Sequence, residues 1–401
     1  MTPKSLFALA VAAQLASAGC GSSAPAPVNN NTVVTTGQNV QPIVVNPGPA
    51  GDYANGVFTS VTICVPGSTT NCQTIDGVLV DTGSTGLRIL SSALKLSLPQ
   101  QNAGGNPVAE CFPFEDGFTW GPVQTADVAM ASERAASVPI QIVGAPAFST
   151  IPDSCTSSGG PSENTLNTLD ANGVLGIGLF RQDCGPACTI SGASNPGLYY
   201  SCAGSNCQII AESLTQQLQN PVWLFPADNN GVIVELPAIS ATGASTVNGS
   251  LVFGIGTQAD NALGSATIFT VDGQGTMTTT FQGKSYNGAF IDTGSNGLFF
   301  LDAVTTGLTV CADSNDFYCP PTPQSFSATL RGANATSGNV TFTVGNADQL
   351  LNNSLLSAFP MLAGPNPGTF DWGLPFFYGR NVFTAIESQT TPAGFGPYWA
   401  Y

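Results

Sequence analysis

The stretch VDTGSTGLRIL runs from Val80 to Leu90 and places the sequence Asp-Thr-Gly-Ser at the end of a short apolar run. The stretch IDTGSNGLFFL, from Ile291 to Leu301, repeats this setting 211 residues further along the chain. Aligned without gaps, residues 76–90 and 287–301 are identical at eight of fifteen positions. A single copy would suit an ordinary turn or a helix N-cap. Two copies in matched apolar surroundings indicate an internal repeat with one aspartate in each half.

A second element recurs in both halves. The apolar, glycine-containing segment NGVLGIGLF, residues 172–180, follows the first motif, and FDWGLPFFYGR, residues 370–380, follows the second. We expect each Asp-Thr-Gly loop to be paired with the later strand of its own half.

The composition predicts a mostly β fold. The 401 residues include 46 Gly and 29 Pro, and short apolar runs alternate with turn residues, which favours many short strands over long helices. One helix is predicted over residues 207–220, because Ile210, Leu214 and Leu218 follow a helical spacing.

The charges and the missing histidine exclude several functions. Eight Lys and Arg against 24 Asp and Glu give a net charge of −16, so nucleic acid and anionic membrane surfaces are poor partners. The chain has no histidine, which excludes Ser-His-Asp and Cys-His catalysis and His-ligated zinc. Carboxylates, hydroxyls, thiols or the few lysines must supply any chemistry.

The first fifty residues predict an exported chain. MTPK, an apolar run and small residues before Gly19-Cys20 form a secretory signal, residues 1–19. Cys20, followed by GSSAPAP, resembles a bacterial lipobox, in which this cysteine is lipidated. Residues 20–50 then form a flexible tether. We expect an outer-membrane lipoprotein facing the periplasm or the surface. The alternative is ordinary cleavage after Ala16-Ser17-Ala18 and secretion.

Ten cysteines remain beside Cys20, and an even number in an exported chain indicates disulfides rather than a metal site. No Cys-x-x-Cys pair supports metal binding. Connectivity does not follow from sequence alone, but short loops favour four pairs and leave a fifth: Cys64 with Cys72, Cys184 with Cys188, Cys202 with Cys207, Cys311 with Cys319, and Cys111 with Cys155.

The paired motifs and the strand-like segments after them resemble the pepsin-like aspartic proteases over residues 52–401. The layout also resembles bacterial lipoproteins with a doubled Asp-Thr-Gly. The resemblance implies a bilobal acid-protease fold with a central cleft, an N-terminal lobe of residues 51–225 and a C-terminal lobe of residues 226–401. GFTWGPVQTADVAM, residues 117–130, resembles the hairpin flap over that cleft, and Arg88 stands where the family carries tryptophan.

The same resemblance implies the site residues, with no metal and no cofactor. In that family the threonine hydroxyl of each motif bonds to the opposite loop, and glycine allows the loops to approach. The expected residues are the catalytic Asp81 and Asp292, the supporting Thr82, Gly83, Ser84, Thr293, Gly294 and Ser295, and the flap candidates Phe114, Phe118 and Trp120.

Two functions follow from this resemblance. The first is an aspartic-type endopeptidase in which two carboxyls activate a water, with an extended peptide or unfolded protein as substrate and the chain acting as a monomer. The alternative is an inactive scaffold that binds an extended peptide or an envelope partner. The intact aspartates favour the enzyme, whereas Arg88 and the unmatched flap tyrosine favour the scaffold.

Overall fold

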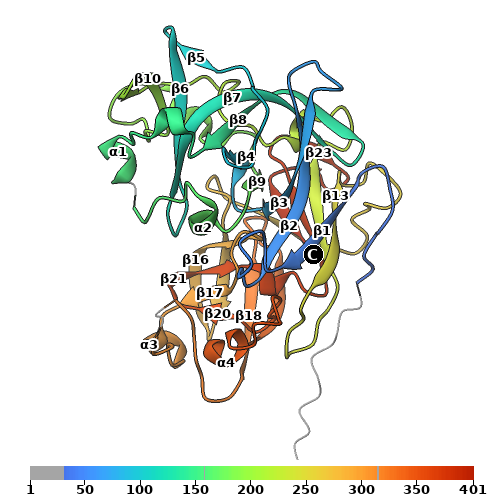
Figure 1. Ribbon diagram of the computed structural model, residues 1–401. Coiled ribbons are helices and arrows are strands. Elements are labelled where there is room, and N and C mark those ends of the chain that lie inside the picture. Colours follow the sequence, from blue (N-terminus) through green and yellow to red (C-terminus); the bar gives the residue numbers. More distant parts are fainter. Residues whose placement is uncertain (1–30, 158, 314–315) are drawn as a thin grey trace, which may run out of the picture.

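The structure is a computed structural model that describes residues 31–157, 159–313 and 316–401. It is built mainly of strands, as the composition predicts, and the two halves of the chain form two lobes (Figure 1). The helices are short: α1 (Asp153–Thr156), α2 (Leu166–Leu169), α3 (Ala303–Thr306), α4 (Ala347–Leu351), and the 3-10 turns Pro146–Phe148, Gly185–Thr189, Val222–Leu224 and Leu374–Phe376.

The strands fall into three sheets. Those up to the middle of the chain are β1 (Val40–Asn46), β2 (Gly56–Cys64), β3 (Cys72–Asp81), β4 (Thr85–Leu90), β5 (Asn102–Ala103), β6 (Asn106–Pro113), β7 (Phe118–Met130), β8 (Glu133–Val143), β9 (Gly173–Ile177), β10 (Tyr199–Ala203) and β11 (Asn206–Ile209). The remainder are β12 (Gly231–Leu236), β13 (Val247–Phe253), β14 (Ile268–Thr270), β15 (Met277–Phe281), β16 (Lys284–Ile291), β17 (Leu298–Leu301), β18 (Gln324–Arg331), β19 (Ser337–Val344), β20 (Ala363–Gly364), β21 (Asn366–Trp372), β22 (Arg380–Ala385), β23 (Thr390–Thr391), β24 (Gly394–Phe395) and β25 (Tyr398–Ala400).

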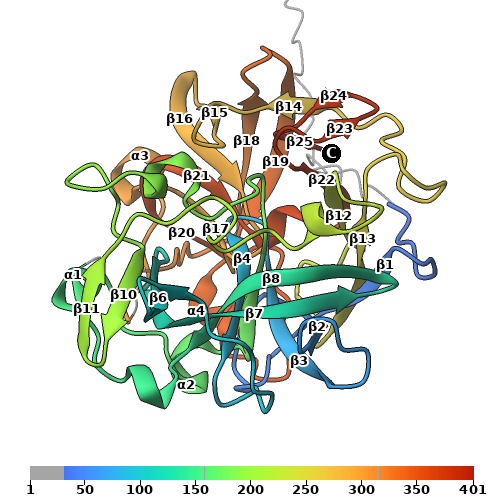
Figure 2. The same cartoon turned by 90° about the horizontal axis from the view of Figure 1, so that it is seen from above.

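The first lobe is a closed ring of strands. Its order is β2, β3, β9, β4, β8 and β7, and β7 pairs back with β2. The long β7–β8 hairpin lies across one side of this ring (Figure 2). Valine, isoleucine and leucine side chains of these strands are fully buried in the main core. Closure removes the open edges that the sheet would otherwise expose.

The predicted internal repeat is confirmed by the strand pairing. In the first lobe β3 lies parallel to β9, and β4 lies antiparallel to β9 and parallel to β8. In the second lobe β16 lies parallel to β21, and β17 lies antiparallel to β21 and parallel to β20. Each motif therefore leaves its strand beside the later glycine-containing strand of its own half, as the sequence predicts.

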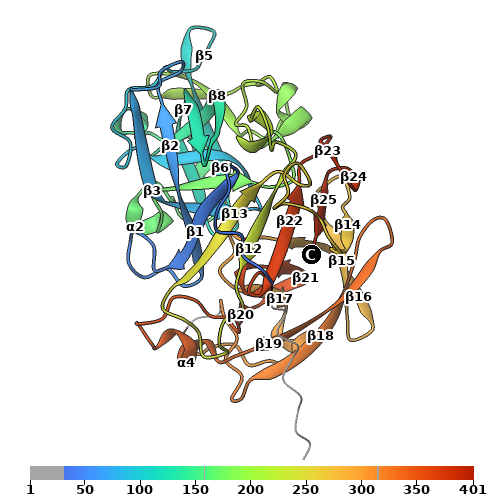
Figure 3. The ribbon, with the colours of Figure 1, turned by 90° about the vertical axis from the view of Figure 1, so that its right-hand side faces the viewer.

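The prediction of a flexible tether up to residue 50 is wrong for its last part. Residues 40–46 form β1, which pairs with β2 of the first half and β13 of the second. Ile43 and Val45 are buried in the main core, so this strand joins the halves (Figure 3). The segment reads VQPIVVN, and its apolar residues find their partner strand only after about two hundred residues.

The helix predicted over residues 207–220 is also wrong. Its first residues belong to β11, which pairs with β10 through the disulfide-linked Cys202 and Cys207. After the strand, the Leu218 amide donates to the Tyr199 hydroxyl at 2.7 Å, and Leu214 is exposed. The helical spacing arises by chance in an irregular segment that other elements hold in place.

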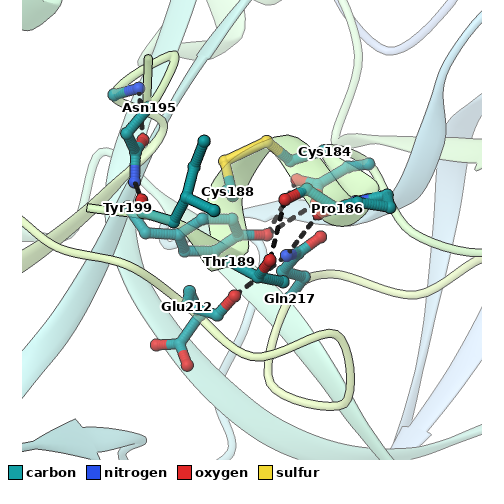
Figure 4. The surroundings of a disulfide bond; sticks show 12 residues. Cys184, Pro186, Cys188, Thr189, Asn195, Tyr199, Glu212 and Gln217 are labelled. Atoms are coloured by element: carbon teal, nitrogen blue, oxygen red, sulfur yellow. Dashed lines mark hydrogen bonds between the residues drawn. A yellow bond between two sulfur atoms is a disulfide. The ribbon is translucent and has the colours of Figure 1, made fainter. Parts of the chain in front are cut away.

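The predicted disulfide connectivity is confirmed for all five pairs. Figure 4 shows the Cys184–Cys188 bond with Tyr199 and Gln217 nearby. The Gln217 side chain donates to the carbonyl of Gly185 in the same turn. Cys20 and the signal segment lie outside the described residues. Within the described ranges no helix has the length and apolar character needed to cross a bilayer.

The Cys111–Cys155 bond is expected to stabilise the fold most, since it closes the longest loop, with a separation of 44 residues. Loop-closure entropy predicts that replacing both cysteines with alanine lowers the free energy of unfolding by about 4 kcal/mol, against about 2 kcal/mol for the Cys184–Cys188 pair. Denaturant unfolding of the two double variants measures this difference. Equal losses would contradict the chain-entropy account.

Candidate active site

The two Asp-Thr-Gly loops meet where the lobes join. The Thr82 amide donates to Thr293 Oγ1 at 3.1 Å, and the Thr293 amide donates to Thr82 Oγ1 at 3.0 Å. Thr293 Oγ1 donates in turn to the carbonyl of Val80 at 2.7 Å. Both threonines are buried. Because the bonds are reciprocal and shielded from water, they fix the position of one loop against the other.

The glycines of the motifs allow the aspartates to approach the opposite loop. A Cβ added at Gly83 would lie 2.5 Å from the carboxyl carbon of Asp292. A Cβ added at Gly294 would lie 2.8 Å from Asp81 Oδ1. Any larger residue at either position would therefore collide with the carboxyl group of the other half.

Both carboxylates are held by donors of their own loops. Asp81 Oδ1 accepts from the amides of Gly83 and Ser84 at 2.8 and 3.1 Å, and Oδ2 accepts from the Ser84 hydroxyl. Asp292 Oδ1 accepts from the Gly294 amide at 2.7 Å. The loops thus orient the two side chains without using basic residues.

The pair has the electrostatics of a shared proton. Burial raises the pKa of Asp292 well above its ordinary value, and the neighbouring charges of Asp81 and Asp371 and the hydrogen bond that protonated Asp292 donates to Asp81 act in the same direction. Two carboxyls this close do not both ionise readily, so one keeps its proton while the other is charged. Asp81 is buried, but Asp292 is only half-buried and Gly83 beside it is exposed, so solvent reaches one side of the pair.

A third carboxyl, which sequence reasoning missed, belongs to this group. Asp371 lies in β21, is 6% exposed, and accepts from the Ser295 hydroxyl at 2.5 Å. The same hydroxyl lies 3.1 Å from Asp292 Oδ2. Burial raises the pKa of Asp371 to about 8, and the charges of Asp81 and Glu115 add to this. No motif marks a lone aspartate inside an aromatic strand.

The three flap candidates separate in the structure. The β6–β7 hairpin turns over residues 114–117, so Phe114 lies at the turn and is partly exposed. Phe118 and Trp120 are buried at 3% and 1% exposure in β7. Trp120 packs edge-on against Tyr200 and donates to the carbonyl of Phe148. Of the three, only Phe114 lies at the turn of this hairpin, and its role as a flap residue stays a prediction.

Arg88 ties β4 to the β6–β7 hairpin. Its guanidinium is fully buried, donates to Glu110 at 2.7 Å and Asp183 at 3.3 Å, and lies 3.6 Å from the ring centroid of Phe112. Glu110 and Phe112 belong to β6, so β4, the strand after the first motif, is tied directly to β6. Burial raises the pKa of Asp183, and Glu110 raises it further. Arg88 thus supplies packing where the resemblance implied a lost tryptophan.

Tyr53 is a further site residue that sequence reasoning missed. Burial raises the pKa of its phenol, with added contributions from the charges of Asp116 at the flap turn and of Asp81 and Asp292. Its neighbour Asn55 is buried and donates to the carbonyl of Asn296, next to Ser295, at 2.8 Å. The loop before β2 therefore reaches the second motif and places a phenol near both carboxyls and the flap.

Raised carboxyl pKa values predict that the fold is more stable at acidic pH. The pKa of Glu163 rises to about 8 through burial and Asp116, and that of Glu235 to about 7 through burial. These groups keep protons in the folded state that the unfolded chain releases above about pH 4. Stability therefore falls as pH rises from about 5 to 8, and the Tm falls by several degrees. Glu163→Gln should flatten this dependence, whereas Asp313→Asn at an exposed position should not; equal slopes would contradict the prediction.

One cluster in the described residues has the residue types of a metal site, namely Cys311, Cys319 and Asp348. Its two sulfurs form a disulfide with each other, so they are not thiolate ligands. The expectation that no metal takes part in the chemistry stays a prediction.

Comparisons with known proteins place the chain in a family. No curated protein matches the sequence. Matching solved structures include the crystal structure of an aspartic proteinase from Irpex lacteus, which is 13% identical, with a TM-score of 0.49 over 90% of this chain and 96% of that one. The profile of a family described as "Protein of unknown function (DUF3443)" matches residues 35–401. Since this match spans most of the sequence, the chain belongs to the DUF3443 family.

Proposed function

We propose that the protein is an aspartic-type endopeptidase. The observation that carries the proposal is the meeting of two carboxyls, one from each lobe, across loops locked by reciprocal threonine hydrogen bonds. The chain has no histidine, and the titratable groups that meet at the two motif loops are carboxyls, so we assign the acid and base roles to them. Asp292, whose pKa is raised, holds the proton, and Asp81 acts as the base.

In the proposed reaction Asp81 takes a proton from a water as the water attacks a peptide carbonyl. Asp292 donates a hydrogen bond to the carbonyl oxygen and stabilises the charge that develops there. Asp81 then passes the proton that it took from the water to the leaving amine, and the C–N bond breaks. Asp292 keeps its own proton, so the pair again holds one proton. Two carboxyls suffice for each step, so no metal or cofactor is required.

We also propose the setting in which this occurs. The chain is exported as a monomer and anchored through lipidated Cys20, with the outer membrane as its site. Five disulfides support an oxidising compartment. The substrate is an extended peptide or an unfolded protein, since an extended chain presents its carbonyls to carboxyls at a loop junction.

The test is hydrolysis of an unfolded protein by purified residues 31–401 between pH 3 and 7, with mass spectrometry of the products. We expect cleavage with an acidic optimum, blocked by a peptide mimic of the tetrahedral intermediate. Binding of the mimic without cleavage at any pH would instead favour the scaffold function, in which the junction holds a peptide that it does not cut.

A further inference from the structure

The second lobe differs from the first at one position beside the carboxyl pair. In β21, Asp371 pairs with Phe290 and Trp372 pairs with Ile291. In the first lobe, Val174 pairs with Leu79 and Leu175 with Val80. Because Ile291 and Val80 both precede the motif aspartates, Asp371 takes the place of Val174. The second lobe thus has a buried carboxyl, Asp371, at the position where the first lobe has the apolar Val174.

The Ser295 hydroxyl connects Asp371 to Asp292. The Ser295 hydroxyl lies within hydrogen-bond distance of Asp371 Oδ2 and of Asp292 Oδ2, at 2.5 and 3.1 Å. A serine hydroxyl carries one proton and can donate it to one carboxyl only. Both contacts are hydrogen bonds only if one carboxyl is protonated and donates to Ser295 Oγ. The three groups therefore form a chain that stores a proton.

The proton can sit at either end of this chain. In one arrangement Asp371 donates to Ser295, which donates to Asp292. In the other, Asp292 donates to Ser295, which donates to Asp371. The two interconvert when each oxygen passes its proton to the next, so that the negative charge moves from Asp292 to Asp371. No other reactant is required.

The surroundings of Asp371 favour retention of a proton. Its Oδ1 is buried and accepts no hydrogen bond from the described residues, which costs more for a charged carboxylate than for a neutral acid. The titratable groups that act on it are Asp81, Asp292 and Glu115 of the flap turn, all acidic.

The neighbouring strands add no cation at this point. The strand β16 carries Lys284 and Tyr286, which contact each other at its start, with the Lys284 nitrogen 4.9 Å from the ring. The strands β17, LFFL, and β20, Ala-Gly, carry no titratable residue. Within these described strands, the pair and Asp371 thus share their protons without a neutralising base.

We propose that Asp371 is a positioning residue for the carboxyl pair. Linked to Asp292 through Ser295, it keeps a proton on the Asp81–Asp292 pair up to higher pH than two carboxyls alone would. The inference rests on the proposed function, in which one protonated and one ionised aspartate are needed. Its consequence is hydrolysis that extends further toward neutral pH.

The test replaces the carboxyl with an amide of the same shape. In Asp371→Asn the Ser295 hydroxyl keeps a partner, but the charge and the stored proton are lost. We expect the alkaline limb of the kcat profile to move to lower pH by about one unit or more, with KM changed little, because the stored proton that Asp371 can pass through Ser295 to Asp292 has been lost. Asp228→Asn, at another buried aspartate bound to Thr257 and Gln258, should leave the limb in place.

Titration by carbon-13 NMR of labelled aspartate carboxyls separates this inference from the question of activity. In the wild-type protein the resonances of Asp292 and Asp371 should titrate in two coupled steps, and in Asp371→Asn the pKa of Asp292 should fall by about one unit or more. A coupled titration in a protein that cuts nothing would support the inference while the proposed function fails. Independent single-step curves in the wild type, or an unmoved Asp292 in the variant, would overturn it.

Discussion

Asp81→Asn and Asp292→Asn are each expected to lower kcat/KM for an unfolded protein at acidic pH by about 10³-fold or more, because each removes one partner of the general acid–base pair. The amide keeps the shape of the carboxyl, and the Gly83, Ser84 and Gly294 amides still find an oxygen acceptor. Fold and Tm should therefore change little. Rates from product quantification, with circular dichroism on the same samples, measure both effects.

The effect of the two substitutions should not add. Since the aspartates act as one unit, the double variant should be no slower than the worse single variant within error. Asp228→Asn serves as the control for an aspartate buried elsewhere. If either single variant kept full activity, hydrolysis would have to come from another part of the molecule. Wild-type protein that binds a peptide mimic but never cuts would leave the scaffold as the function.

The strand pairing around the two motifs could be predicted because the same sequence pattern occurs in both halves of the chain. The doubled Asp-Thr-Gly-Ser and the later glycine strands predict which strands pair, and the structure confirms that β3 lies beside β9 and β16 beside β21. Short loops favoured four of the five disulfides, and the structure contains those four pairs. In both cases the contacting residues belong to a repeated motif or lie close in sequence, so the contact can be predicted from the sequence.

The parts that were missed depend on partners far away in the chain. The strand β1 is defined by β13, whose Val252 pairs with Val40. Asp371 is one carboxyl in FDWG, and its role emerges only when Ser295 is brought to it, 76 residues earlier in the sequence. Tyr53 reaches the site because Asn55 is bound to Asn296 of the other lobe. None of these contacts leaves a periodic or spaced signal.

The buried ion cluster of Arg88, Glu110 and Asp183 predicts a large effect on stability. Arg88→Ala should lower the free energy of unfolding by about 3 to 5 kcal/mol, because it leaves the carboxyls of Glu110 and Asp183 buried without their cation. Arg134→Ala is the matched control: its side chain is 33% exposed, and losing its pair with Asp127 should cost about 1 kcal/mol or less. Denaturant unfolding at one pH compares the two.

The same cluster separates charge from packing. Arg88→Met retains apolar volume against Phe112 but still strands the two carboxyls, so it should remain strongly destabilised. Adding Glu110→Gln to Arg88→Met removes one of these charges, while Asp183, whose pKa is already raised, can stay neutral, so much of the lost stability should return. If the double variant were no more stable than Arg88→Met, lost packing rather than stranded charge would be the cause. Glu110 and Phe112 lie on β6, so the rescued double variant also tests whether the β6–β7 hairpin needs the cation itself. If hydrolysis recovers together with stability, Arg88 supports β6 and takes no part in the chemistry of the carboxyl pair.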